Sequence, residues 1–327
     1  MRIAVDALGS DNRPVPDVEG AVWAAREYKN DIILVGDQTR IQAELAKHNT
    51  SGLSITIQHA ADAVTMNDKP RDVVRGKPDS SMHVGMQLVK DGRADAFVTA
   101  GNTGAALAIA MLGPLRRIKG IKRPALGVLV PTPGRPLLID GGANADSTAE
   151  HLLQCAQMGS IYVSRMNDIP QPTVGLISNG EEETKGNKVI QEAVTLLKES
   201  NLNYIGAIEP KEFLNAEADV AITDGFVGNI IMKTVEATAK KLVDTLRTEI
   251  RASFLTTIGG LLARPAFSRV NQLLNSDLVG GSPLLGVDGI VMIAHGRSNS
   301  TAIKNAIGQA NLVVQAEVVQ ALKTQFE

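Results

Sequence analysis

The sequence predicts an α/β protein with a mostly parallel, doubly wound sheet. Three observations support this: a chain of 327 residues, an ordinary globular composition with 44% hydrophobic and 21% charged residues, and apolar β-branched runs that alternate with segments of helical spacing. Such alternation is typical of βαβ units, in which helices cover both faces of the sheet. We therefore expect a single α/β unit over residues 1–327.

The expected elements follow one another along the chain. Short apolar runs predict strands at residues 2–5, 31–35, 53–57, 94–99, 125–130, 136–140, 173–177, 204–208 and 218–223. Apolar residues recurring every three or four positions predict helices at residues 17–28, 39–48, 81–90, 147–166 and 187–199. The uncharged stretch 96–115 is long enough to span a membrane, but it contains Gly101, Asn102 and Pro114. A strand, a loop and a buried helix are expected there instead.

The last third of the chain is mainly helical. Residues 229–276 predict a long helical excursion that protrudes as a hairpin and is interrupted at Gly259, Gly260 and Pro265. Another helix is expected over residues 301–324. Long helices of this kind often pack against a second subunit, so we expect a homodimer.

Charge and cysteine content restrict the partners and the compartment. Lys and Arg number 33 and Asp and Glu 35, which gives a net charge of −2, and aromatic residues make up only 3%, so no nucleic-acid partner is expected. The single cysteine, Cys155, excludes an intramolecular disulfide, and the beginning MRIAVDALGSD lacks the apolar run of a secretory signal. A cytoplasmic location is expected.

Five turns share one local design, in which an apolar strand ends, a polar turn with glycine follows and a helix begins. They are FVTAGNTGA (97–105), LLIDGGANAD (137–146), GLISNGEEETKGN (175–187), AITDGFVGNI (221–230) and VMIAHGRSNS (291–300). Ligands of open α/β folds bind at the carboxyl ends of the strands, so these turns are expected to converge on one crevice. Helix N-termini and glycines there favour binding of an anion, and phosphate is the expected ligand.

Polar side chains in these turns are candidates for catalysis. An amide N–H stabilises a carbonyl oxygen that gains negative charge, and the candidates for this role are Asn102, Asn144 and Asn229. The alternative for each is a helix cap or a turn contact. Lys185 places a cation for phosphate or is a solvated loop lysine. His295 carries a proton or is a structural histidine.

No cofactor or metal is expected. The sequence lacks the glycine-rich dinucleotide fingerprint, the P-loop, the serine elbow and the zinc-protease motif. Five aspartates that could surround a divalent ion are interpreted as helix caps: Asp6, Asp140, Asp146, Asp224 and Asp288.

A basic run, RRIKGIKR, stands out on an otherwise neutral chain. Its five cations are Arg116, Arg117, Lys119, Lys122 and Arg123. Such a run favours an acidic partner, with a solvated turn as the alternative.

An apolar row lies within the helical excursion. The side chains expected to contact a membrane are Phe254, Leu255, Ile258, Leu261 and Leu262. Arg247, Arg251, Arg264 and Arg269 flank them, as in segments that enter a bilayer interface beside anionic lipid. A helical hairpin buried in a dimer is the alternative.

Taken in order, the motifs resemble those of a known family. They are DALGSD (6–11), KPDSS (77–81), AGNTGA (100–105), RPAL (123–126), DGGAN (140–144), EETKG (182–186), GFVGN (225–229) and HG (295–296). This order resembles the acyl-acyl carrier protein:phosphate acyltransferase family of bacterial phospholipid synthesis over nearly the whole chain. The chain departs from the family pattern at DALGSD, usually DAMGGD, and at ISNG (177–180), usually LNIG.

The resemblance implies a fold related to isopropylmalate dehydrogenases and phosphate acetyltransferases, a homodimer without a nucleotide cofactor, and peripheral attachment to the inner face of the membrane. It also implies conversion of long-chain acyl-acyl carrier protein and inorganic phosphate to acyl phosphate and free carrier protein. The product would be consumed by an integral-membrane glycerol-3-phosphate acyltransferase, and the basic run would bind the carrier protein.

The expected mechanism needs no protein nucleophile. Phosphate would be held by residues of two turns: Gly101, Thr103, Gly104, Lys185, Gly186 and Asn187. It would attack the thioester carbonyl while an asparagine stabilises the oxyanion and His295 passes a proton to the departing sulfur. Two alternatives stay open: a coenzyme A-dependent enzyme similar to phosphate acetyltransferase, and a non-enzymatic membrane scaffold. A metal-dependent dehydrogenase is more distant.

Overall fold

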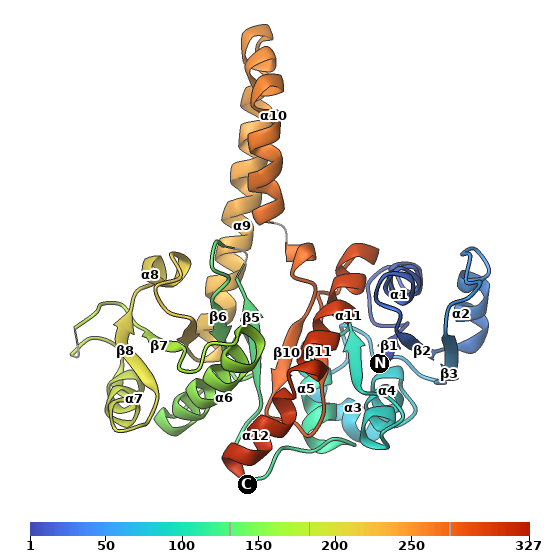
Figure 1. Cartoon of the computed structure of the whole chain (residues 1–327), viewed down its shortest axis with the longest axis horizontal. Helices are drawn as coiled ribbons and strands as arrows, with labels where there is room; N and C mark the ends of the chain where they lie inside the picture. Colours follow the sequence, from blue (N-terminus) through green and yellow to red (C-terminus); the bar gives the residue numbers. More distant parts are fainter. Residues whose placement is uncertain (131, 183, 275) are drawn as a thin grey trace.

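The computed structural model describes residues 1–130, 132–182, 184–274 and 276–327. Glu183 of the EETKG motif and Asn275 of the helical excursion lie outside the described residues. The strands are β1 (Arg2–Asp6), β2 (Asp31–Gly36), β3 (Ile55–His59), β4 (Ala96–Thr99), β5 (Ala125–Leu129), β6 (Leu137–Ile139), β7 (Thr173–Ile177), β8 (Asn203–Ile208), β9 (Val220–Ile222), β10 (Ser282–Leu285) and β11 (Val291–Ile293). They form a single sheet (Figure 1).

The helices include those that the periodicity predicts and several that it does not. They are α1 (Val15–Tyr28), α2 (Gln38–Leu45), α3 (Pro70–Gly76), α4 (Ser81–Lys90), α5 (Thr103–Leu112), α6 (Ala149–Asn167), α7 (Lys188–Lys198), α8 (Pro210–Leu214), α9 (Gly225–Ile250), α10 (Phe254–Leu273), the 3₁₀ turn η1 (Ser276–Leu278), α11 (Ser300–Gln315) and α12 (Val318–Phe326). The stretch 96–115 is β4, a loop and α5, as expected from its glycine, asparagine and proline.

The sheet is parallel on both sides of an antiparallel centre. Its strand order is β3-β2-β1-β4-β11-β10-β5-β6-β9-β7-β8. The pairs β11–β10, β10–β5 and β5–β6 are antiparallel, and the other pairs are parallel. The prediction of a mostly parallel sheet is confirmed. The antiparallel centre was not predicted, because β10 is a short SPLL segment without a distinctive pattern.

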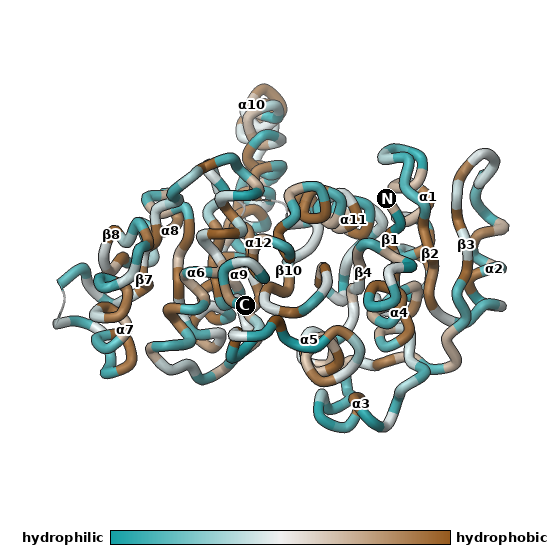
Figure 2. Tube along the Cα trace, turned by 60° about the horizontal axis from the view of Figure 1, so that its bottom comes forward, coloured by the Kyte–Doolittle hydropathy of each residue, from teal (hydrophilic) through white to brown (hydrophobic). Residues whose placement is uncertain are grey.

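Helices cover both faces of the sheet. Successive residues of β1 point to opposite faces: Ile3 and Val5 pack in the core cluster that includes α1, α6 and α11, whereas Ala4 packs with α4 and α5. A third cluster packs Met232 of α9 and Phe213 of α8 against β7, β8 and β9. In Figure 2 the hydrophobic colour concentrates on strands and inner helix faces.

Helices α9 and α10 protrude from the body as an antiparallel hairpin (Figure 1). The excursion was predicted, but its break was placed wrongly. The chain turns at residues 251–253, where Ser253 and Thr256 form a capping box, and both Gly259 and Pro265 lie inside α10. Gly260 allows α10 to pack closely against α9, because an added Cβ would lie 2.3 Å from Cγ2 of Ile250.

The C-terminal helix expected over residues 301–324 is also corrected. It is divided into α11 and α12 at Ala316 and Glu317, and Glu317 has a left-handed backbone with a φ of 51°. The break carries no glycine or proline, so the sequence pattern gives no sign of it.

Candidate active site

A cleft of about 980 Å³ lies between the two parallel parts of the sheet. Four of the five predicted turns contribute to its lining, through Thr103, Gly141, Gly142, Asn229, His295 and Arg297. The central strands β6 and β11 have three residues each, so their two ends are only about 10 Å apart. Short strands therefore allow turns from oppositely directed strands to meet in one cleft.

The N-terminus of α5 opens into this cleft. Asn102 caps the helix by accepting a hydrogen bond from Ala105 N at 3.0 Å, and its amide nitrogen donates to the carbonyls of Thr65, Met66 and Asp68 at 3.2–3.4 Å. Its side chain thus holds the turn, which is the alternative role that the sequence left open. The N–H groups at the first turn of α5, from Thr103 and Gly104, remain outside the helix ladder and can bind an anion.

Asp140 organises the turn after β6. Its buried carboxylate accepts hydrogen bonds from the backbone N–H groups of Leu126, Gly142, Ala143 and Asn144 at 2.8–3.1 Å. The amide nitrogen of Asn144 donates to Asp140 Oδ2 and to the Pro124 carbonyl, both at 2.8 Å. Both amide hydrogens of Asn144 are therefore occupied, so the expectation that Asn144 donates to an oxyanion is corrected by this geometry.

Asn229 presents a free carboxamide to the cleft. Asp224 caps α9 through Val227 N at 2.8 Å, and the first turn of α9 lies against the Asp140 turn, where a Cβ on Gly228 would be 2.0 Å from the Asp140 carbonyl oxygen. Asn229 follows on α9, is exposed and faces Gly142. Within the described residues its side chain makes no hydrogen bond, which leaves its amide hydrogens for a ligand.

His295 belongs to a charged cluster at the same cleft. Its Nε2 lies 3.2 Å from Oε1 of Glu236 on α9, and Glu236 also meets Lys233 Nζ at 3.2 Å and the Arg297 guanidinium at 3.3 Å. The hydrogen bond from His295 and the nearby cations lower the pKa of Glu236 to about 2 against the opposing effect of burial. Glu236 is therefore ionised at neutral pH.

The turn after β7 does not contribute to the cleft lining among the described residues. Asn187 caps α7 through Ile190 N at 3.0 Å, and Gly186 N donates to Asn179 at 2.8 Å. The Gly186 N–H is therefore already paired. Lys185 is exposed, and β7 ends at the same edge of the sheet as β6, two strands or about 10 Å away.

The five cations of the basic run at residues 116–123 are exposed, and none of them lines the cleft. Thr103 begins α5 at the cleft, and the run follows the opposite end of that helix, which is 10 residues or about 15 Å long. Lys122 pairs with Glu150, Arg117 donates to the Lys122 carbonyl, and Arg123 donates to the Asp146 carbonyl at 2.9 Å.

The apolar row forms the end of the hairpin. Phe254, Leu255 and Leu262 are each about four-fifths exposed, at 80%, 79% and 79%, and Leu261 is 68% exposed. Ile258 is 43% exposed. Among the described residues, no helix is long and apolar enough to cross a bilayer.

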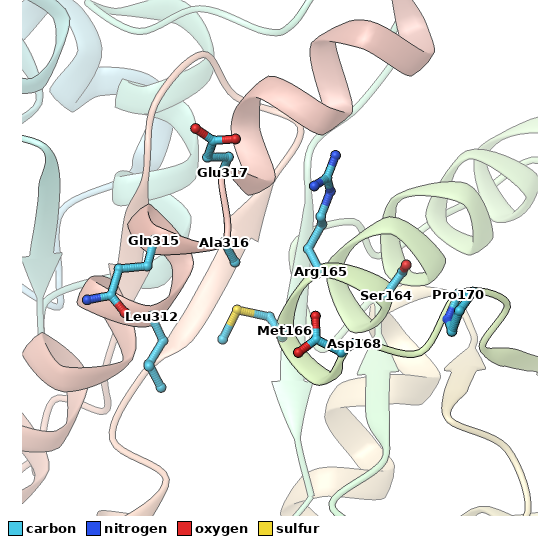
Figure 3. Close-up of a pocket in the computed structure, with 9 residues that line it drawn as sticks. All are labelled: Ser164, Arg165, Met166, Asp168, Pro170, Leu312, Gln315, Ala316 and Glu317. Atoms are coloured by element: carbon cyan, nitrogen blue, oxygen red, sulfur yellow. The ribbon is translucent and has the colours of Figure 1, made fainter.

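A separate cavity of about 610 Å³ lies between α6 and the α11–α12 junction (Figure 3). Its labelled lining, including Arg165, Asp168 and Glu317, contains no residue that the sequence singled out.

Sequence reasoning missed Glu236, Lys233 and Arg297. Arg297 lies in a turn that had been singled out, whereas Glu236 is 59 positions before His295 (295 − 236) on a long helix. No short motif links the two, so only the folded chain brings them together.

Comparisons with known proteins agree with this architecture. A phosphotransacetylase from Streptococcus pyogenes superposes with a TM-score of 0.59 at 17% identity, covering 98% of this chain and 94% of that one. A branched-chain phosphotransacylase from Enterococcus faecalis gives 0.59 at 12% identity, covering 96% and 99%. These likenesses confirm the predicted fold class.

Relatives with similar sequences are curated as phosphate acyltransferases. The protein from Geotalea daltonii is 47% identical over 308 residues, 94% of this chain and 89% of its own. The protein from Geobacter sulfurreducens is 45% identical over 328 residues, 100% and 94%. Together with the α/β fold and its cleft, they define the class as a transferase enzyme. The family model described as "Fatty acid synthesis protein" matches residues 1–321, and the chain belongs to that family.

Proposed function

We propose that this enzyme transfers a long-chain acyl group from the thioester of an acyl carrier protein to inorganic phosphate. The products are acyl phosphate and the free carrier-protein thiol. The observation that carries the proposal is the meeting, in one cleft, of the α5 N-terminus, the free amide of Asn229 and the imidazole of His295. The name shared by the relatives supports phosphate as the acceptor.

The chemistry needs positioning rather than a protein nucleophile. A phosphate oxygen, held near the first N–H groups of α5, attacks the thioester carbonyl carbon. Asn229 donates to the carbonyl oxygen as negative charge develops, and the carbon–sulfur bond then breaks with its electron pair on sulfur. His295 gives the thiolate a proton, and the proton lost by hydrogen phosphate restores the imidazolium.

The cleft walls favour a long acyl chain over an acetyl group. Apolar side chains from two elements, β5 and α9, line it: Leu126, Val128, Met232, Val235 and Val243. This lining matches an alkyl chain, since each methylene removed from water contributes about 0.8 kcal/mol. An acetyl group is too short to cover these apolar walls, so they would add no binding energy in a coenzyme A-dependent enzyme that transfers acetyl.

The surfaces outside the cleft suggest where partners bind. The basic run at residues 116–123 would attract an acidic carrier protein, and the hairpin end would enter the membrane interface beside anionic lipid. Exposed apolar residues lower on the hairpin, including Leu242 and Val270, would pack in a homodimer. Attachment at the inner face of the membrane would place acyl phosphate beside an integral-membrane glycerol-3-phosphate acyltransferase.

Thiol release tests the proposed function. We expect release from long-chain acyl-acyl carrier protein only when inorganic phosphate is present, and much slower release from acyl-coenzyme A. Asn229→Ala should lower kcat strongly, whereas Asn201→Ala, at an exposed turn, should not. Faster turnover of acyl-coenzyme A would favour the coenzyme-dependent alternative, and vesicle binding without thiol release would favour a scaffold.

A further inference from the structure

Glu236 joins the two parallel parts of the sheet across the cleft. It lies on α9, which follows β9, whereas His295 and Arg297 follow β11 in the other part. The carboxylate meets His295 Nε2 at 3.2 Å through Oε1, and it meets Arg297 at 3.3 Å and Lys233 at 3.2 Å through Oε2. The Glu236 side chain is only 18% exposed, so it is the least exposed member of this cluster.

The two side chains from the β11 turn are otherwise poorly fixed. His295 is 48% exposed and Arg297 is 65% exposed, and both lie in the turn between β11 and α11. Exposed side chains of this length adopt several rotamers in the absence of a partner. In the described residues, Glu236 is the partner recorded for both side chains.

We infer that Glu236 is a positioning residue that fixes the imidazole of His295 for proton transfer. Because Nε2 faces Glu236, Nδ1 is the ring atom left to donate a proton to the departing sulfur. This inference rests on the proposed function. Glu236 itself touches neither the phosphate nor the acyl group in this scheme.

A double-mutant cycle separates positioning from a general loss of structure. Glu236→Gln should lower kcat at least tenfold and leave the KM for phosphate and for the acyl substrate within twofold. Glu236→Asp should recover part of the loss. Glu249→Gln, the same change at an exposed position of α9, should behave as the unchanged enzyme.

In a His295→Asn background, Glu236→Gln should cost no more than twofold. An equal loss of kcat with and without His295 would overturn the inference, as would unchanged turnover of Glu236→Gln. Failure of the unaltered enzyme to release thiol in the presence of phosphate would refute the proposed function instead.

Nuclear magnetic resonance gives a readout that does not depend on activity. The chain has five histidines, so the His295 ring resonance can be assigned by its loss in His295→Asn. We expect this resonance to move in Glu236→Gln and to stay in place in Glu249→Gln. A resonance that does not move in Glu236→Gln also overturns the inference.

Discussion

Replacing the two most exposed leucines at the end of the hairpin should release the protein from membranes. Leu255 and Leu262 are each 79% exposed and lie in the first half of α10. The hairpin that α9 and α10 form protrudes far from the sheet (Figure 1). Complete burial of a leucine contributes about 1.5–3 kcal/mol, so the pair contributes at least about 3 kcal/mol if fully inserted. This corresponds to about a 100-fold change in partition, or about tenfold if only half of that surface leaves water.

Co-sedimentation with anionic phospholipid vesicles measures this change. The Leu255→Ser/Leu262→Ser variant should bind at least tenfold more weakly than the unaltered protein. Leu312→Ser, at a 48% exposed leucine of α11 in the body, serves as the control. Equal vesicle binding by all three proteins would refute the membrane interpretation. A change from dimer to monomer in sedimentation velocity, without a change in vesicle binding, would favour the buried dimer hairpin instead.

Three further measurements test separate parts of the molecule. Lys185→Ala should raise the KM for phosphate about tenfold, the loss expected for one charge-assisted hydrogen bond, and an unchanged KM would remove Lys185 from the scheme. Replacing Arg116, Arg117 and Lys119 by Glu should weaken carrier-protein binding at low salt, and the affinities of the variant and the unaltered protein should become equal at high salt. A loss of affinity that does not depend on salt would argue against this docking surface. Burial raises the pKa of Asp17 to about 7 against its hydrogen bond from Ser10, so the free energy of unfolding should fall as pH rises from about 4 to about 7. Urea unfolding at several pH values should show a smaller fall for Asp17→Asn, and identical pH dependence would contradict the assignment.

Local patterns in the sequence predicted the outer parallel strands and most of the helices. The continuous apolar runs of β1, β2 and β7 and the caps of α5, α7 and α9 are features of neighbouring residues, and neighbouring residues suffice to recognise them. The antiparallel centre depends on β10 pairing with β5, which lies more than 150 residues earlier in the chain. The hairpin turn was misplaced because glycine and proline were given more weight than the Ser253 capping box.

The residues of the candidate site were predicted only in part, because their roles also depend on contacts that the local sequence does not show. Asparagines after strands were recognised as amides near an anion, but a helix cap and an oxyanion donor have the same local sequence. Only the contacts separate them: Asn102 and Asn144 donate their amide hydrogens to oxygen atoms of the protein, whereas the Asn229 side chain makes no hydrogen bond within the described residues. Whether Asn229 contacts the substrate stays a prediction.

The continuity of α9 connects these observations. A single helix of 26 residues carries Asn229 near its N-terminus, Glu236 beside His295, and Ile250 at the hairpin crossing. At 1.5 Å per residue, Asn229 lies about 30 Å along the helix axis from its last residue. Because α9 has no proline or internal break, one continuous helix links the hairpin turn at residues 251–253 to the Glu236 contact. If the hairpin end enters the bilayer as proposed, vesicles should change the His295 resonance in the unaltered protein but not in Leu255→Ser/Leu262→Ser.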